Sequence, residues 1–469
     1  MSTPLPLAAI RILKPLPCQR PLSSDNVIVM SVTGDHQAPL ADDPSDPITL
    51  CNEFNKIKSI EDLSNQLEMA GFTDVVVVPV SLETVAQVAD ALENEMKEKQ
   101  EQDQDLVVFQ LCDGTELDGY TGVSIIHELE KRKIAYTGSD SGTSKPILKR
   151  ELQKAHVPTS SFQEFSIVPQ PTDLENIIRE IGFPMIVKPS ISYASINISK
   201  TSVVHTPEQL LEQITLSLNA SMTGGKLGNH LEDEELKQQL QENHQDQNVL
   251  NIAMMTKEQK MEIDIETPTV FVEKFLAGRE FTALVIGDKD WGVRVYPVAE
   301  RAFDPKLGKF ERLLSFDQYW DGYDLEGNMG DTSNEEFCKY EIANKDWQEH
   351  LQQVARDAYL ALDGSGYGRV DIRTIEMDGC EPVVLEVNAN CGLSFEKDSS
   401  SLANILLMSK VDPPGFVRDL IDHALQRKKR LHEAGPTYIH KMAHHANPAT
   451  AYNTSARDTQ DTVLILVQG

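Results

Sequence analysis

The chain has 469 residues with 40% hydrophobic and 25% charged content, which fits a soluble protein of about two or three domains with a sizeable core. The formal net charge of −30 argues against nucleic acid and anionic membrane as main partners, and no apolar run is long enough to span a bilayer. The six cysteines lack CxxC spacing, which predicts free thiols in a reducing compartment, and we expect a cytoplasmic protein.

Prolines and basic residues interrupt the first 25 residues, so residues 1–25 are predicted to form a disordered arm. An N-terminal α/β substrate domain is predicted over residues 26–142, because continuous apolar strands alternate with helices, which indicates a parallel sheet. The predicted strands are Asn26–Val32, Asp74–Val80 and Asp105–Leu111, and the predicted helices are Ser59–Ala70, Glu83–Gln104 and Val123–Arg132.

A polar hairpin is predicted over Gly366–Ser394. Asp378-Gly379 is a strong turn signal between two apolar runs, and a turn centred there places Asp371 opposite Glu386 and Arg369 opposite Asn388. Side chains two apart on a strand share a face, so these four project to the same side. The opposite side, which can be buried, then carries Val370, Ile372, Leu385 and Val387.

Two interpretations of this polar face stay open. Carboxylate and amide oxygens suit Mg²⁺ held jointly with nucleotide phosphates, and the arginine suits a phosphoryl group in transfer. The alternative is a solvated hairpin with a cross-strand salt bridge, since polar outer faces are normal in antiparallel sheets.

Several motifs in order resemble the D-alanine–D-alanine ligase branch of the ATP-grasp superfamily. They are IAYTGSDSGTSKPILKRELQKAHVP from Ile134, FPMIVKPS, SYASINIS, TVFVEKFLAGREFTALVIG and the hairpin itself. The resemblance implies a parallel α/β domain followed by two α+β domains that clamp ATP. We therefore expect a central ATP-grasp domain over 143–276 with a surface insertion at 220–267, a C-terminal catalytic domain over 277–435, and a tail over 436–469.

The resemblance also implies roles for individual residues. Arg369 would stabilise the phosphoryl group in transfer, and Gly392 would keep the backbone open beside the second substrate. Mg²⁺, with Mn²⁺ as an alternative, would be held by Asp371, Glu386 and Asn388. The implied nucleotide-binding residues are the phosphate-binding Lys145, Lys188 and Ser195, the adenine hinge Glu273, Lys274 and Leu276, and the ribose-binding Glu280, with Lys149 as a nearby alternative for phosphate.

The sequence departs from the ligase pattern at several points. The loop SYASINIS has no glycine, and Tyr319 stands near the place of an expected lysine, for which Lys309 or Arg312 could substitute. Cys391 follows the hairpin where the ligases have proline. The N-terminal loop that would grip the ammonium group of the first D-alanine is not recognisable in TGDHQAPLADDP, so we expect a substrate other than D-alanine.

The function implied by the resemblance is an ADP-forming carboxylate–amine ligase that works through an acyl phosphate. Its partners would be a small-molecule carboxylate and an amine, and relatives of this kind usually form homodimers. Two other functions stay open: an ATP-binding protein with weakened turnover, and an ATP-dependent kinase of a small acid.

Overall fold

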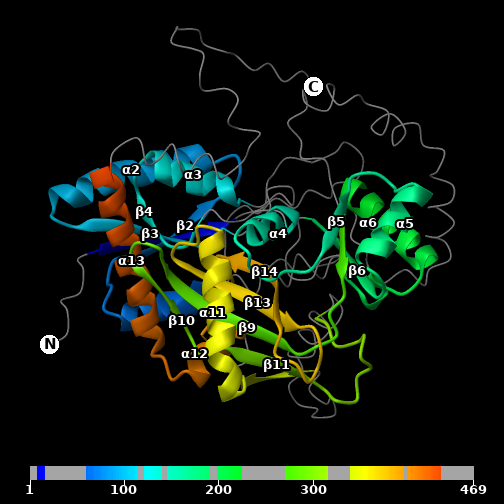
Figure 1. Ribbon diagram of the computed structural model, residues 1–469. Coiled ribbons are helices and arrows are strands. Elements are labelled where there is room, and N and C mark those ends of the chain that lie inside the picture. The colour runs from blue at the N-terminus through cyan, green and yellow to red at the C-terminus, as the bar shows by residue number, and fades with distance from the viewer. Residues whose placement is uncertain are drawn as a thin grey trace, which may run out of the picture.

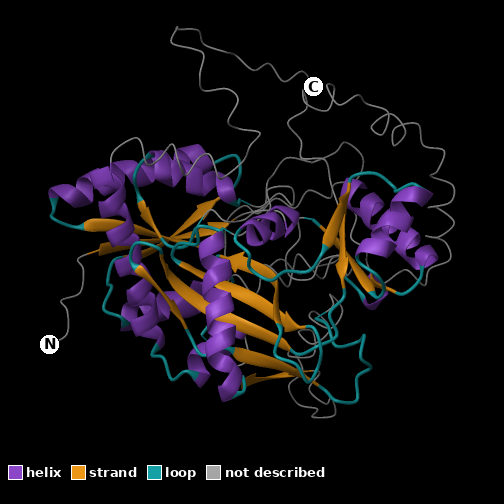
Figure 2. Ribbon diagram, viewed as in Figure 1, coloured by secondary structure: helices purple, strands orange, loops and turns teal. Residues whose placement is uncertain are grey.

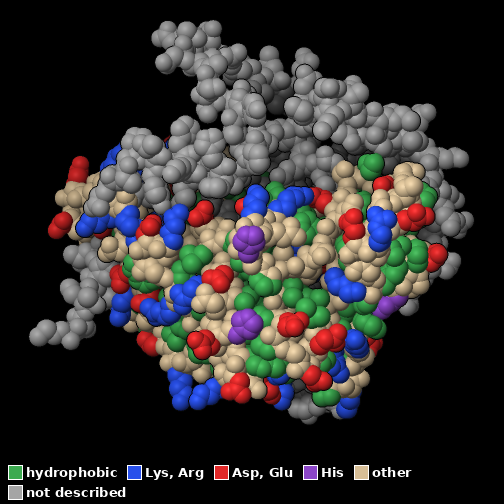
Figure 3. Space-filling model, viewed as in Figure 1, with side chains coloured by type: hydrophobic (Ala, Val, Ile, Leu, Met, Phe, Trp, Pro, Cys, Tyr) green, Lys and Arg blue, Asp and Glu red, His purple; other side chains and the backbone are tan. Residues whose placement is uncertain are grey.

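The computed structural model describes residues 8–15, 60–112, 121–139, 145–190, 198–223, 270–314, 338–395 and 400–434. Within these ranges the chain forms one parallel and two antiparallel sheets, with helices packed on their faces (Figure 1; Figure 2). The predicted α/β class is therefore confirmed. No helix in these ranges is long and apolar enough to cross a bilayer. Acidic and basic side chains are interspersed over the described part of the face in Figure 3.

The N-terminal sheet is parallel and has helices on both faces. Its elements are β1 (Ala8–Pro15), β2 (Val75–Val80), α2 (Val85–Glu101), β3 (Asp105–Gln110), α3 (Val123–Lys131) and β4 (Ala135–Tyr136), with a further helix over residues 60–69. The strand order is β2-β1-β3-β4. Leu13 packs with the buried side chains of α2 and α3, whereas Ile10 and Ile12 pack with the helix over 60–69. Burial on both faces explains the continuous apolar run from which β3 was predicted, whereas Val76 and Val77 of the edge strand β2 are exposed.

The prediction of a disordered arm is wrong at β1, which lies inside the sheet between β2 and β3. Arg11 interrupts the apolar sequence of this strand, but its side chain is buried and paired with Asp74 at 2.8 Å and with Glu95. The ion pairs compensate the buried charge, so a basic residue is compatible with a central strand. The strand predicted at Asn26–Val32 lies outside the described residues.

A small antiparallel sheet follows. Its elements are α4 (Lys145–Lys154), β5 (Phe162–Phe165), α5 (Pro171–Glu180), β6 (Met185–Pro189), β7 (Val203–Val204), α6 (Pro207–Thr223) and β8 (Val270–Lys274). The strand order is β5-β8-β6-β7. Val187 and Val272 face the core formed with α5 and α6. Because side chains alternate along a strand, Lys188 and Glu273 face the other way.

The largest sheet carries the predicted hairpin. Its elements are β9 (Glu280–Asp288), β10 (Gly292–Val295), β11 (Ala299–Phe303), β12 (Cys338–Ile342), α11 (Lys345–Ala361), β13 (Tyr367–Thr374) and β14 (Pro382–Ala389), followed by α12 (Ser401–Met408) and α13 (Pro413–Ala434). The order is β12-β11-β9-β13-β14, and β10 pairs with β9. Helix α11 crosses one face of this sheet (Figure 1), where it packs on Val370, Ile372 and Val384. The polar side chains of the hairpin are therefore directed to the opposite face.

Candidate active site

The predicted register of the hairpin is confirmed where the polar residues lie. Asp371 is paired with Glu386 and Arg369 with Asn388. The predicted tight turn is wrong, because β13 ends at Thr374 and β14 begins at Pro382. A β-bulge between Asp371 and Ile372 shifts the pairing by one residue, which restores the predicted register at the polar end.

The bulge changes which apolar side chain is buried on β14. Ile372 is paired with Val384 instead of Leu385. Val384 is fully buried, whereas Leu385 is only half-buried, so the prediction of Leu385 as a core residue is wrong. Val370, Ile372 and Val387 are buried as predicted.

The four polar side chains of the hairpin are in mutual contact. Arg369 donates from Nε to Asp371 Oδ1 at 3.1 Å and from Nη2 to Asp371 Oδ2 at 2.9 Å. The Asn388 amide nitrogen donates to Asp371 Oδ2 at 3.0 Å and to Glu386 Oε1 at 3.1 Å. One amide group thus lies between two carboxylates, which brings their oxygens together on the polar face.

The electrostatics of the two carboxyl groups differ. Burial acts to raise the pKa of Glu386, but the charges of Lys145 and Arg369 outweigh it and hold the pKa at about 2. Burial raises the pKa of Asp371 in spite of the adjacent Arg369, and the charge of Glu386 adds to the rise. Two carboxyl groups this close favour a cation between them.

Lysines from the small sheet and from α4 lie beside this cluster. Lys145 Nζ, at the start of α4, is 3.6 Å from Glu386 Oε2 on β14. Glu273 has an ion pair on each side, with Lys188 at 2.7 Å from Oε1 and Lys149 at 2.7 Å from Oε2. Burial acts to raise the pKa of Glu273, but the charges of Lys149 and Lys188 hold it at about 2. The predicted phosphate-binding lysines and metal ligands are therefore brought together.

Glu280, the predicted ribose carboxylate, is buried between two arginines that were not among the predicted site residues. Arg301 contacts Glu280 Oε1, and Arg373 Nη1 lies 3.6 Å from Oε2. The three residues lie side by side on β11, β9 and β13. Arg373 shares the strand face of Arg369 and Asp371, so the same alternation of RVDIRT could have identified it. Nothing in the sequence around Arg301 indicated the pairing, which depends on the strand order.

The remaining predicted residues are placed differently. Lys274 Nζ donates to the carbonyl oxygens of Gly182 and Phe183, at 3.1 and 2.7 Å, and Leu276 is buried, so only their backbone is available for an adenine edge. A side chain added at Gly392 would meet nothing within 4 Å, which fits an open backbone beside a substrate. Ser195 lies outside the described residues.

The two substitutes for the missing lysine lie in the segment after β11. Arg312 donates to the carbonyl oxygens of Leu307 and Pro305 within its own segment. Lys309 lies over the ring of Phe310, 5.8 Å from its centroid, and Phe310 packs against Phe275 just after β8. Lys309 is thus connected through Phe310 to the residue after the predicted adenine hinge strand, while Tyr319 is outside the described ranges. Cys391 is buried in the core.

The chemistry of the hairpin fits a hard divalent cation. Asp371, Glu386 and Asn388 offer oxygen ligands, once the Asn388 amide is rotated so that its oxygen replaces the nitrogen. Thr282, opposite Asp371 on β9, has a buried hydroxyl without a hydrogen-bond partner in the described part of the chain, which a ligand or its water could satisfy. Among the described residues no group of three or more His, Cys, Asp or Glu could hold a metal ion.

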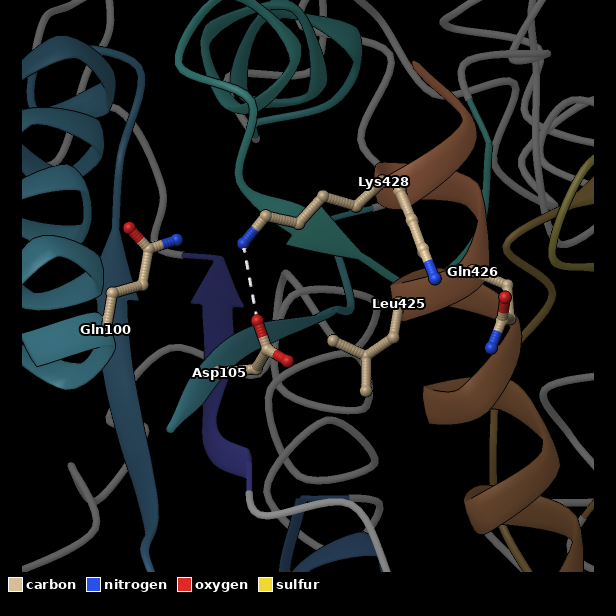
Figure 4. A pocket seen from close by; sticks show the side chains of 6 residues that line it. Gln100, Asp105, Leu425, Gln426 and Lys428 are labelled. Atoms are coloured by element: carbon tan, nitrogen blue, oxygen red, sulfur yellow. Dashed lines mark ion pairs between the residues drawn. The ribbon is translucent and has the colours of Figure 1, made fainter. Parts of the chain in front are cut away.

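A separate pocket of about 460 Å³ lies between α2, β3 and α13 (Figure 4). Lys428 Nζ is 3.7 Å from Asp105 Oδ1 at its rim, and Gln100, Leu425, Gln426 and Lys429 complete the lining. None of these residues belongs to the hairpin or to the lysine cluster, so the pocket is distinct from the candidate site.

Comparisons with known proteins show which proteins the chain is similar to. Residues 247–422 match the family model described as D-ala D-ala ligase C-terminus. The D-alanine–D-alanine ligase of Nitrosococcus oceani is 24% identical over 305 residues, which are 64% of this chain and 72% of that protein. The D-alanine–D-alanine ligase of Desulfotalea psychrophila is 26% identical over 255 residues, which are 54% of this chain and 58% of that protein.

The fold is also found in a solved structure. The D-alanine–D-alanine ligase of Coxiella burnetii matches with a TM-score of 0.51 at 14% identity, over 92% of this chain and 99% of that one. The resemblance to the D-alanine–D-alanine ligases, predicted from the sequence, is thereby confirmed as a similarity: residues 247–422 match the C-terminal family model of these ligases, and the fold is similar to that of a solved one.

Proposed function

We propose that this chain is an ATP-dependent carboxylate–amine ligase that forms an amide bond through an acyl phosphate. The observation that carries the proposal is the 3.6 Å contact between Lys145 and Glu386. The contact supports the proposal because a metal-bound triphosphate needs a cationic side chain for its phosphates close to the ligands of its metal ion.

In the proposed reaction the substrate carboxylate attacks the γ-phosphorus of ATP, which forms an acyl phosphate and releases ADP. The amine then attacks the acyl carbon and releases phosphate, so that one ATP is used for each amide bond. The Lys145 and Lys188 ammonium groups would bind the phosphates, and the Arg369 guanidinium would stabilise the phosphoryl group in transfer and the oxyanion on the acyl carbon. Asp371, Glu386 and Asn388 would hold Mg²⁺, which would neutralise negative charge on the phosphates.

We further propose that the substrates are small molecules other than a pair of D-alanine molecules, and that the chain forms a homodimer. The substrate proposal is supported by the sequence TGDHQAPLADDP, in which the loop that would bind the first D-alanine is not recognisable. The segment Phe395–Ser401, which follows Gly392, is also longer than its equivalent in the ligases, and it would form part of the wall for the second substrate.

Product analysis tests the proposal. The full chain is incubated with Mg-ATP and pools of amino acids and small carboxylic acids, with D-alanine alone as a separate pool. ADP and phosphate formed only with a pair of substrates support a ligase, and deconvolution of the pool identifies the pair. A phosphorylated acid without an amide would indicate a kinase, while AMP and pyrophosphate would overturn the acyl-phosphate mechanism. Activity with D-alanine alone would refute the substrate proposal.

A further inference from the structure

Lys149 is a buried cation that does not reach the surface of the candidate site. Its side chain is 0% exposed, and it lies on α4 one turn after Lys145. Its ammonium group contacts Glu273 Oε2 at 2.7 Å and donates to Thr159 Oγ1 at 3.0 Å. A lysine enclosed in this way cannot touch a nucleotide, so a role in binding would have to act through its neighbours.

The charge balance around Glu273 indicates what that role is. Glu273 is also buried, and its second oxygen is paired with Lys188, whose side chain is 15% exposed. With both lysines protonated, the two lysines and the carboxylate together carry one net positive charge; burial lowers the pKa of Lys149, and the charge of Glu273 opposes this shift. If Lys149 were neutral, Glu273 would neutralise Lys188, and the group that faces the phosphates would carry no net charge.

We propose that Lys149 is a positioning residue that compensates Glu273 and so leaves Lys188 with a net positive charge for the nucleotide phosphates. This inference rests on the proposed function, because it takes a phosphorylated nucleotide as the ligand. It assigns to the Glu273 carboxylate the task of holding Lys188 in place, rather than contact with the adenine ring.

A second set of contacts connects Lys149 to the hairpin. Thr159 Oγ1 donates to the carbonyl oxygen of Val384 at 3.0 Å, and the Val384 amide donates to Pro158 O at 2.8 Å. Val384 is paired with Ile372 next to the β-bulge that aligns Glu386 with Asp371. A purely structural role for Lys149, as a tether between α4 and β14, would act through this path, and it has to be separated from the role in charge balance.

The experiment compares the binding of Mg-ATP and adenosine by calorimetry to the full-length wild type and four variants. Lys149→Met removes the buried charge and keeps a side chain of similar volume. Lys149→Gln also removes the charge, but its amide nitrogen can still donate a hydrogen bond to Thr159 Oγ1. Thr159→Val removes the tether and keeps the charge. Lys154→Met is the matched control, because Lys154 is an exposed lysine on the same helix.

We expect Lys149→Met to weaken Mg-ATP binding by at least about tenfold, because Glu273 would then neutralise Lys188, the lysine proposed to bind the phosphates. Adenosine has no phosphate, so its affinity should stay within about twofold of wild type, as should both affinities of Lys154→Met and Thr159→Val. If Lys149→Met does not fold, Lys149→Gln takes its place.

A double variant provides the decisive test. Adding Glu273→Gln to Lys149→Met leaves Lys188 as the one charge of the three residues, and the amide oxygen introduced can still accept the hydrogen bond that holds Lys188 in place. Mg-ATP affinity should therefore recover to within about threefold of wild type. Lack of recovery, equal losses for adenosine and ATP, or wild-type affinity in the single variant would overturn the inference. Failure of the wild type to bind Mg-ATP would instead overturn the proposed function, and the inference with it.

Discussion

Replacement of Arg369 by alanine should have different effects on the folding stability of the protein and on its catalytic turnover. The guanidinium group donates from Nε and Nη2 to the Asp371 carboxylate, which is also close to Glu386 and Asn388. Arg369→Ala removes the positive charge and leaves Asp371 with the amide of Asn388 beside it. We therefore expect a loss of folding stability in the free protein and a much larger loss of turnover.

The magnitude follows from the burial of the ion pair. Removing one partner of a fully buried pair costs about 3–5 kcal/mol, because the other charge stays buried without compensation. Side-chain exposure is 25% for Arg369 and 9% for Asp371, so solvent screens part of this cost. We expect the free energy of unfolding to fall by about 1–3 kcal/mol. Loss of a group that stabilises charge in the transition state should lower kcat by about 10²–10³-fold.

The assays are chemical denaturation with and without Mg-ATP, and steady-state kinetics on the substrate pair found by product analysis. Bound Mg²⁺ would compensate Asp371, so the stability difference between variant and wild type should narrow with Mg-ATP. The KM for ATP should change by less than about threefold, since the arginine acts mainly on the group in transfer. Arg294→Ala is the control, because Arg294 forms a half-exposed pair with Asp419 and should change stability by about 0–1 kcal/mol. Turnover within about threefold of wild type in Arg369→Ala would refute the assigned role.

Two further predictions concern the metal site and the pH dependence of stability. Asp371→Asn combined with Glu386→Gln should weaken Mg-ATP binding by at least about tenfold, with a smaller effect on ATP without Mg²⁺; equal affinities for Mg-ATP in variant and wild type would exclude these residues as metal ligands. Burial lowers the pKa of His423, although its hydrogen bond to Asp288 opposes the shift. Because the unfolded chain then binds the proton more tightly, stability should decrease as pH falls below about 6.5, and His423→Gln should flatten this slope. Denaturation midpoints between pH 5 and pH 8 measure the slope, and an equal slope in the variant would contradict the assignment.

Alternation within single strands was enough to predict the polar face of the hairpin. Arg369, Asp371, Glu386 and Asn388 lie together because side chains two apart share a face, which is a local property of the backbone. The predicted strand register is also correct at these positions, although the tight turn from which it was predicted is not present. A longer connection between β13 and β14 and a β-bulge offset each other, and neither could be recognised from the turn dipeptide.

The sequence by itself determined the α/β class, the family resemblance and the identity of the residues on the hairpin, because these follow from local periodicity and from motifs in order. Only the tertiary structure decided the partners of the buried charges. Arg11 lies in a central strand because Asp74 and Glu95 compensate it. Lys149 and Glu273 are far apart in the chain, and their pairing depends on how α4 packs beside β8. Such contacts depend on which elements become neighbours, and periodicity along one segment carries no information about a neighbour from elsewhere in the chain.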